Sequence, residues 1–186
     1  DGGILSTADR HESPRLRAEI PRGTGTAAAS GNFGNITAGL FAKRMGLPVR
    51  RFIAANNRND IFLQYLRSGK YEPKPSVSTL ANAMDVGAPS NFARILDLYG
   101  GSHDAVCAEI SGASYTDEQI RETLADVYRR CHYLLDPHGT CGYRALSEGL
   151  KPGETGVFLE TAHPAKFLGT PGILPDTAVS AFCPPW

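Results

Sequence analysis

Short apolar runs alternate with amphipathic segments along the chain, and this order constrains the fold more than any other feature. Residues 49–55, introduced by Pro48, have the pattern of a strand, and residues 156–160 are a short apolar run of strand length. Segments with helical periodicity and turn residues at their ends lie between them. Strands that alternate with helices pair in parallel and are covered by the helices. The sequence therefore predicts an α/β fold with a parallel sheet.

The clearest predicted helix begins at Thr116, where Gln119 completes a capping box. Apolar residues then recur at helical spacing as far as Leu135, and we expect Pro137 to end this helix. Other segments combine a shorter apolar stripe with a stop signal such as glycine. They predict further helices over residues 35–45, 60–67, 91–99 and 141–150.

Glycine and proline are concentrated at both ends of the chain. Residues 1–29 contain six of them, and residues 169–186 contain another six. Segments of this kind bury too little apolar surface to offset the entropy lost on ordering. We therefore predict an organised region at 30–168 between two poorly ordered ends, 1–29 and 169–186.

Composition argues against several classes of partner. The chain has 19 Lys and Arg against 19 Asp and Glu, whereas nucleic-acid binding needs excess positive charge. No apolar run approaches the roughly 18 residues that span a bilayer. The four cysteines form no CxxC pair, which favours a reduced, cytoplasmic protein without a zinc site. His103, His132 and His138 lack metal-ligand spacing and are expected to be ordinary side chains.

The segment SGNFGN, residues 30–35, directly precedes a predicted helix. Gly31 and Gly34 let the backbone turn tightly and approach a ligand closely. The helix start offers unpaired N–H groups and the positive end of a dipole, so the segment suits a phosphate. Ser30 and the Asn side chains can add hydrogen bonds. The alternative is an ordinary turn with Asn35 as the helix cap, since the pattern is neither GxGxxG nor a Walker loop.

Polar side chains also follow two of the predicted strands, where ligands lie in open α/β sheets. Thr161 and His163 follow the run at 157–159, and the alternative there is a polar loop that closes the strand. Residues 54–60 contain three Asn, an Arg and an Asp. They suit either a polar substrate or helix capping by Asp60.

Four segments in this order resemble the carboxyl half of the threonine synthase family. They are SGNFGNITAGLFAKRMGLPVRRFIAANNRND, STLANAMDVGAPSNFARI, DPHGTCGYRAL and TAHPAKF, within residues 30–168. The family is similar to the tryptophan synthase β family and shares its three-layer, parallel-sheet fold type II. The resemblance implies pyridoxal 5′-phosphate as cofactor. It also implies conversion of O-phosphohomoserine and water into L-threonine and phosphate.

The resemblance also implies roles for individual residues. Thr161 corresponds to the hydroxyl partner of the pyridine nitrogen. Arg58 or Arg94 is the candidate partner of a substrate phosphate. The cofactor-phosphate loop corresponds to Gly31, Asn32, Phe33, Gly34 and Asn35. The substrate side is assigned to Asn56, Asn57, Arg58 and Asp60.

The chain departs from the family pattern in two respects. The family's Schiff-base lysine lies in a Ser-Phe-Lys-Asp-like segment before the glycine loop, but the first lysine here is Lys43. Residues 1–29 and 169–186 do not look like the family, so we expect a partial chain with foreign ends, as frame errors produce. Turnover by this chain is not expected. The alternatives are a non-catalytic phosphate-binding fragment and another enzyme of this cofactor family, such as a dehydratase.

Overall fold

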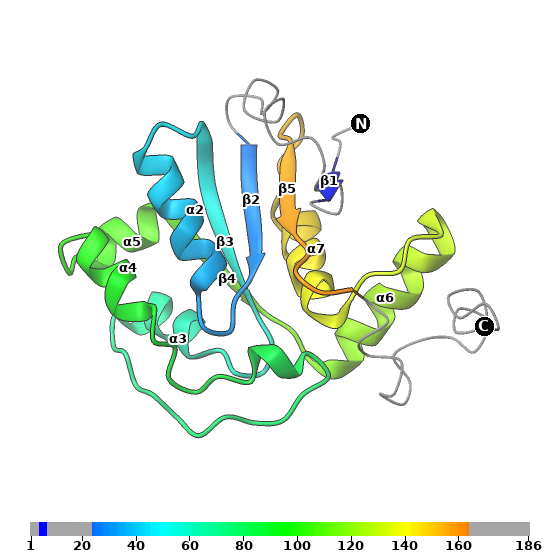
Figure 1. The fold of residues 1–186 in the computed structure, drawn as a ribbon, viewed down its shortest axis with the longest axis horizontal. Helices are drawn as coiled ribbons and strands as arrows, with labels where there is room; N and C mark the ends of the chain where they lie inside the picture. The colour runs from blue at the N-terminus through cyan, green and yellow to red at the C-terminus, as the bar shows by residue number, and fades with distance from the viewer. Residues whose placement is uncertain (1–3, 7–23, 164–186) are drawn as a thin grey trace.

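The computed structural model describes residues 4–6 and 24–163. Five parallel strands form one sheet in the order β1-β5-β2-β3-β4 (Figure 1). The predicted α/β fold with a parallel sheet is confirmed. In chain order the strands are β1 (Ile4–Ser6), β2 (Thr24–Ala29), β3 (Val49–Asn56), β4 (Ile110–Ser114) and β5 (Gly156–Leu159).

Helices cover both faces of this sheet, which gives three layers (Figure 1). One face carries α2 (Gly34–Arg44), α3 (Ile61–Ser68), α4 (Phe92–Leu98) and α5 (His103–Glu109). The other face carries α6 (Asp117–Cys131) and α7 (Pro137–Gly149). A short 3-10 helix, η1 (Asn82–Met84), interrupts the long loop between α3 and α4.

The alternation of side chains along β3 divides the core into two clusters. Phe52 and Ala54 face the α2 side, where Ile36 is among their buried neighbours. Ile53 and Ala55 face the α7 side. Successive strand residues point to opposite faces, so the uninterrupted apolar stretch at 52–55 must be covered on both. The two arginines of the strand, Arg50 and Arg51, lie near its start, where burial is incomplete.

The prediction of poor order for residues 1–29 is wrong for Thr24–Ala29, which form the buried central strand β2. Its alanines bury little apolar area, but they let α7 approach the strand closely. A Cβ built on Gly142 of α7 lies 3.8 Å from the backbone nitrogen of Ala29. Close helix–strand packing therefore orders a segment that composition alone predicts to be loose. Apart from β1, the rest of 1–29 lies outside the described residues, as do 164–168 and the predicted tail 169–186.

The boundary between α6 and α7 also differs from the prediction. Helix α6 ends at Cys131, followed by His132 in the left-handed region at φ 52°. Pro137 begins α7 instead of ending α6, because proline lacks only an N–H that the first helical turn leaves unpaired. Asp136 caps α7 by accepting from the N–H groups of His138 and Gly139. The sequence also gave no sign of α5 and β4.

The predicted capping box at the start of α6 is present. Thr116 Oγ1 accepts from the backbone N–H of Gln119 at 3.4 Å, and the Gln119 side chain accepts from Thr116 N at 2.9 Å. We expect Thr116→Ala to lower the free energy of unfolding by about 1 kcal/mol, measured by urea denaturation. Ser147→Ala is the control, because Ser147 is exposed and bonds only within α7. Equal unfolding midpoints for both variants would contradict a stabilising cap.

The three described cysteines are free and differ in exposure. Cys131 and Cys107 are exposed, whereas Cys141 is buried in the core. Burial raises the pKa of the Cys141 thiol to about 12. Partial burial and the nearby charge of Asp104 also raise the pKa of Cys107.

Because the thiolate is the reactive form, the cysteines should differ in alkylation rate. We expect iodoacetamide to modify Cys131 first, then Cys107, and to modify Cys141 only after unfolding. Peptide mass spectrometry of the folded and urea-unfolded chain measures the order. Modification of Cys141 in the folded chain at the rate of Cys131 would contradict its burial.

Among residues 4–6 and 24–163, no helix is long and apolar enough to cross a membrane.

Candidate functional site

The glycine loop lies between two other predicted site segments at the carboxyl edge of the sheet. In the register of β2 with its neighbours, Ala28 pairs with Leu159 of β5 and Ala29 pairs with Ala55 of β3. Extending this register beyond the strand ends brings Ser30 level with residue 161 on one side and residue 56 on the other. The fold therefore gathers the loop, Thr161 and Asn56 at one edge. Thr161 is exposed there.

Hydrogen bonds fix the point where the chain leaves β2. Ser30 N donates to the carbonyl of Ala55 at 2.8 Å, and Ser30 Oγ donates to the carbonyl of Ala28 at 2.8 Å. The buried Asn56 side chain donates from Nδ2 to the Ser30 carbonyl at 2.7 Å. Phe33 has a left-handed backbone at φ 62°, and its buried ring lies 4.7 Å from that of Phe62, centroid to centroid. The loop is thus held at both ends.

Gly31 packs directly against the backbone of η1. A Cβ built on Gly31 lies 2.7 Å from Met84 Cα and 3.0 Å from the Ala83 carbonyl oxygen. Contacts below 3.0 Å do not occur for real Cβ atoms, so this position requires glycine. At Gly34 the nearest atom to such a Cβ is Asn91 Nδ2 at 4.0 Å, which leaves that side of the loop open.

Helix α2 begins with no side-chain cap and no acidic residue in its first turn. The cap position is Phe33, so the alternative in which Asn35 caps the helix is wrong; Asn35 lies inside it. A phenylalanine side chain has no acceptor, so the first-turn N–H groups remain available to an anion. The Thr37 hydroxyl nearby is buried, and among the described residues it has no hydrogen-bond partner. The donor set and the open side at Gly34 fit a phosphate group.

The side chain of Asn32 bonds to the protein. Its Oδ1 accepts from Ser90 N at 2.6 Å and Ser90 Oγ at 3.0 Å. Asn91 Nδ2 donates to the Asn32 carbonyl at 2.8 Å, and Arg94 donates to Asn91 Oδ1 at 2.6 Å. The oxygens of Asn32 are therefore occupied by protein donors, so its backbone N–H and its exposed side-chain Nδ2 are the groups that could donate to an anion. Arg94 is linked to the loop through Asn91.

The amides that follow β3 are largely structural. Asn57 is buried, and its Nδ2 donates to Thr79 Oγ1 at 2.8 Å and to Asp85 Oδ1 at 2.8 Å. Asn59, which is also buried, donates to Asp85 Oδ1 at 3.0 Å. Asp85 Oδ2 accepts from Thr79 N at 3.0 Å. These bonds form a network that fixes the loop preceding α4, including η1.

Arg58 and Asp60, which also follow β3, differ in exposure and in hydrogen bonding. Arg58 is exposed shortly after the end of β3. Asp60 occupies the cap position of α3, but its side chain accepts from Gln64 Nε2 at 2.6 Å instead of from a backbone N–H. The interpretation of Asp60 as a capping side chain is therefore wrong. Its carboxylate is satisfied within the helix.

Sequence reasoning missed a buried polar cluster that joins α7 to the end of β5. Asp136 N donates to Glu160 Oε1 at 2.8 Å, and Tyr133 donates to Glu160 Oε2 at 2.7 Å. Burial, with a contribution from the Asp136 charge, raises the pKa of Glu160. His138 is buried between Asp136 and the backbone of Ala83, so it is not an ordinary exposed side chain. The one signal for the cluster was Asp-Pro at the start of a helix, which predicts a cap.

A Cys–His contact on α5 lacks the chemistry of a nucleophilic pair. Cys107 Sγ lies 3.3 Å from His103 Nε2. However, Nε2 also lies 3.1 Å from the Tyr65 carbonyl and 3.0 Å from the Leu66 carbonyl at the end of α3. Carbonyls only accept, so Nε2 carries a proton and cannot take one from the thiol. His103 therefore ties α5 to α3.

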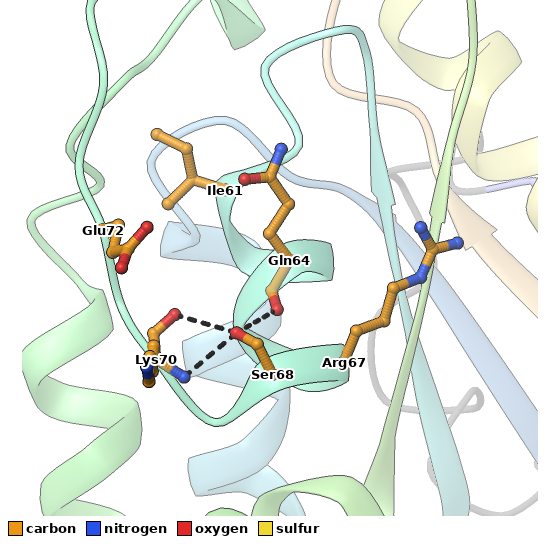
Figure 2. A pocket seen from close by; sticks show the side chains of 6 residues that line it. All are labelled: Ile61, Gln64, Arg67, Ser68, Lys70 and Glu72. Carbon is orange, nitrogen blue, oxygen red and sulfur yellow. Dashed lines mark hydrogen bonds between the residues drawn. The ribbon is translucent and has the colours of Figure 1, made fainter.

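Two surface hollows lie away from the carboxyl-edge residues. The first, of about 320 Å³, is lined by α3 and the chain after it, and Figure 2 shows Ser68 bonded to the backbone of Gln64 and Lys70. The second, of about 470 Å³, lies between α6 and α7. Its cations are balanced, since Arg144 pairs with Glu148 at 2.8 Å and Arg130 with Asp126 at 2.7 Å. Neither hollow contains a predicted site residue.

Comparison with known proteins agrees with this arrangement. Residues 18–161 match the family described as "Pyridoxal-phosphate dependent enzyme". The match includes residues 18–29, so the prediction that the whole of 1–29 differs from the family is wrong for that part. These residues include β2, the strand that leads into the glycine loop.

Curated threonine synthases are similar to the chain in sequence. The protein from Haemophilus influenzae is 46% identical over 138 residues, which are 74% of this chain and 32% of that protein. The protein from Escherichia coli is 44% identical over 154 residues, which are 81% of this chain and 36% of that protein. The chain thus spans about a third of the length of these relatives.

Solved threonine synthases share the fold. The Escherichia coli crystal structure matches with a TM-score of 0.73 and 43% identity over 80% of this chain and 35% of that one. A threonine synthase from Brucella melitensis with bound PLP matches with a TM-score of 0.76 and 33% identity, over 82% of this chain and 38% of that one. The predicted fold type II is confirmed, and the chain belongs to the family of pyridoxal-phosphate dependent enzymes.

Proposed function

We propose that this chain supplies the cofactor-phosphate site of a threonine synthase. The observation that carries the proposal is the uncapped start of α2, directly after a glycine loop at the carboxyl edge of the sheet. The whole enzyme would convert O-phosphohomoserine and water into L-threonine and phosphate. The identity of 46% to a threonine synthase supports this substrate. The free thiols of the described part agree with a cytoplasmic location.

The loop would hold the phosphate of pyridoxal 5′-phosphate mainly through backbone N–H groups. Ser90 orients the Asn32 side chain through Oδ1, so the binding groups would be the backbone amides between Gly31 and Asn35, together with Asn32 Nδ2. Bound cofactor supplies an electron sink for the carbanion chemistry of amino-acid substrates. Thr161 would face the pyridine nitrogen, where a hydroxyl leaves that nitrogen largely unprotonated and so moderates the sink. Its position level with Ser30 supports this assignment.

The substrate side would lie beyond the ends of β2 and β3. Arg58 and Arg94 are the candidates for the substrate phosphate, since a guanidinium pairs with phosphate in a bidentate way. Arg58 is exposed after β3, and Arg94 reaches the loop through Asn91. Asn56 and Asn57 would act indirectly, because their side chains hold Ser30 and the loop before α4.

No described lysine has the context of a Schiff-base residue. Lys43 pairs with Glu109 at 3.2 Å on the far end of α2, and Lys74 donates to Gln64 at 2.7 Å. Lys70 and Lys151 are exposed. We therefore expect the chain to bind the cofactor without turning over substrate.

Titration calorimetry with three ligands tests the phosphate site. We expect pyridoxal 5′-phosphate and inorganic phosphate to bind competitively, and pyridoxal, which lacks the phosphate, to bind at least tenfold more weakly than pyridoxal 5′-phosphate. In ¹⁵N-labelled chain, the amide signals of residues 31–35 should move with either phosphate. Equal affinity for pyridoxal and its phosphate, or shifts confined to other amides, would refute the site.

The other interpretations have less support. A threonine deaminase matches with a TM-score of 0.57 at 15% identity, which shows the fold alone. No contact in the described part favours a dehydratase. A non-catalytic phosphate-binding fragment would bind inorganic phosphate in the same titration without preferring pyridoxal 5′-phosphate over it.

A further inference from the structure

Both ring nitrogens of the buried His138 have hydrogen-bond partners in the protein. Nδ1 lies 2.7 Å from Asp136 Oδ1, and the backbone N–H of Ala83 donates to Nε2 at 3.1 Å. A backbone N–H only donates, so Nε2 has no proton, and the ring proton is on Nδ1 and points at Asp136. The contacts therefore select one neutral tautomer of His138.

Asp136 orients this ring from the start of α7. Its Oδ1 also accepts from the backbone N–H of His138 at 2.8 Å and of Gly139 at 3.2 Å. Asp136 and His138 are 0% and 3% exposed. Helix α7 packs against β2, β3 and β5, so the imidazole is fixed relative to the sheet. A hydrogen bond between Asp136 and the ring sets both its tautomer and its direction.

The other partner of His138 lies in η1, beside the glycine loop. A Cβ built on Gly31 is 3.0 Å from the Ala83 carbonyl oxygen and 2.7 Å from Met84 Cα. The start of η1 has no side-chain cap of its own. The Asp85 network fixes η1 from its carboxyl end, and the bond from Ala83 to His138 fixes its middle. Contacts from two different elements therefore press η1 against Gly31.

We propose that His138 is a positioning residue for the phosphate loop. Its unprotonated Nε2 holds Ala83, and with it η1, against Gly31, which keeps the loop amides aimed at the phosphate. This inference rests on the proposed cofactor-phosphate site and extends it to a residue on the opposite face of the sheet. His138 touches neither the cofactor nor the substrate in this role.

Two substitutions separate positioning from general packing. In His138→Gln, the amide oxygen can accept from Ala83 N near the position of Nε2. In His138→Leu, the volume is similar, but the N–H of Ala83 loses its acceptor and η1 loses its bond to α7. We expect His138→Leu to weaken inorganic phosphate and pyridoxal 5′-phosphate about tenfold or more. His138→Gln should stay within about threefold of the wild-type chain.

Ser102→Ala is the matched control, because it removes the side-chain cap of α5, on the other face of the sheet from α7, without removing a contact of η1 or the loop. It should lower the unfolding midpoint and leave phosphate affinity unchanged. A second measurement needs no variant: the imidazole ¹⁵N spectrum of the wild-type chain should show the tautomer protonated at Nδ1. The tautomer protonated at Nε2 would overturn the inference even if neither His138 variant folds.

The binding outcomes also distinguish this inference from the proposed function. If the wild-type chain binds no phosphate, the proposed site and this inference both fail. If the wild-type chain binds phosphate and a folded His138→Leu chain binds it equally well, only the inference fails. A folded His138→Gln chain that loses as much affinity as His138→Leu also overturns it, because the acceptor would then not be the group that matters.

Discussion

Gly31→Ala is expected to weaken phosphate binding strongly and to destabilise the chain. The added Cβ would lie 2.7 Å from Met84 Cα, and neither that backbone atom nor β2 can move freely. Overpacking of this kind costs about 1–3 kcal/mol. The loop must then shift away from η1, and its backbone N–H groups no longer converge on one point. We therefore expect phosphate affinity to fall by roughly 100-fold. Calorimetry and urea denaturation measure the two effects.

Gly25→Ala is the matched control for that substitution. Gly25 lies on β2, the strand that leads into the loop, and a Cβ built there meets nothing closer than Leu150 Cδ2 at 3.9 Å. We expect near-normal stability and unchanged phosphate affinity. If Gly31→Ala binds phosphate as well as Gly25→Ala does, the contact between the loop and η1 has no role in binding.

Asp85→Ala is expected to have the largest effect on stability. Asp85 accepts four hydrogen bonds: from Asn57 Nδ2, Asn59 Nδ2, Thr79 Oγ1 and Thr79 N. Removing the carboxylate leaves Thr79 N and Thr79 Oγ1 without their acceptor, at about 1–3 kcal/mol for each unsatisfied group. The side-chain amides of Asn57 and Asn59 keep other acceptors but lose one bond each. These costs are not additive, and we expect a loss of about 3 kcal/mol in the free energy of unfolding.

Asp97→Ala provides the comparison, since it also removes a carboxylate but from an exposed position on α4. It should change the unfolding free energy by less than about 0.5 kcal/mol in urea denaturation. Phosphate affinity should fall in Asp85→Ala as well, because Met84 and Ala83 precede Asp85 directly and lie against Gly31. Similar stability of the two variants would show that the Asp85 network contributes little to folding.

The strongly periodic elements were predictable. The strand pattern at 49–55, the capping box at Thr116 and the apolar run at 156–160 correspond to β3, α6 and β5. Each has a local cause, such as burial on both faces or a reciprocal cap. The strand Thr24–Ala29 has no such local signal. Its order comes from neighbouring strands on both sides and from the close approach of α7, which no window of sequence contains.

The site divides in the same way. The glycine loop was recognisable because its glycines and the following helix are adjacent in sequence, and Thr161 because it follows an apolar run. The roles of Asn57 and Asp85 could not be recognised from the sequence, because these two residues bond to each other across 28 positions of the chain. No local pattern marks His138, because its contact with Ala83 spans 55 residues of the chain.

The sequence by itself determined the α/β layer fold, the family resemblance and the glycine loop. Each of these depends on neighbouring residues or on the periodicity of apolar residues along the chain. Only the tertiary structure decided which amides are structural and which face remains open for an anion. It also revealed that η1 packs against Gly31 of the loop and that the imidazole of His138 bonds to η1. Such contacts depend on how distant segments pack, and no local pattern encodes a spacing so close that a Cβ added to Gly31 would lie 2.7 Å from Met84 Cα.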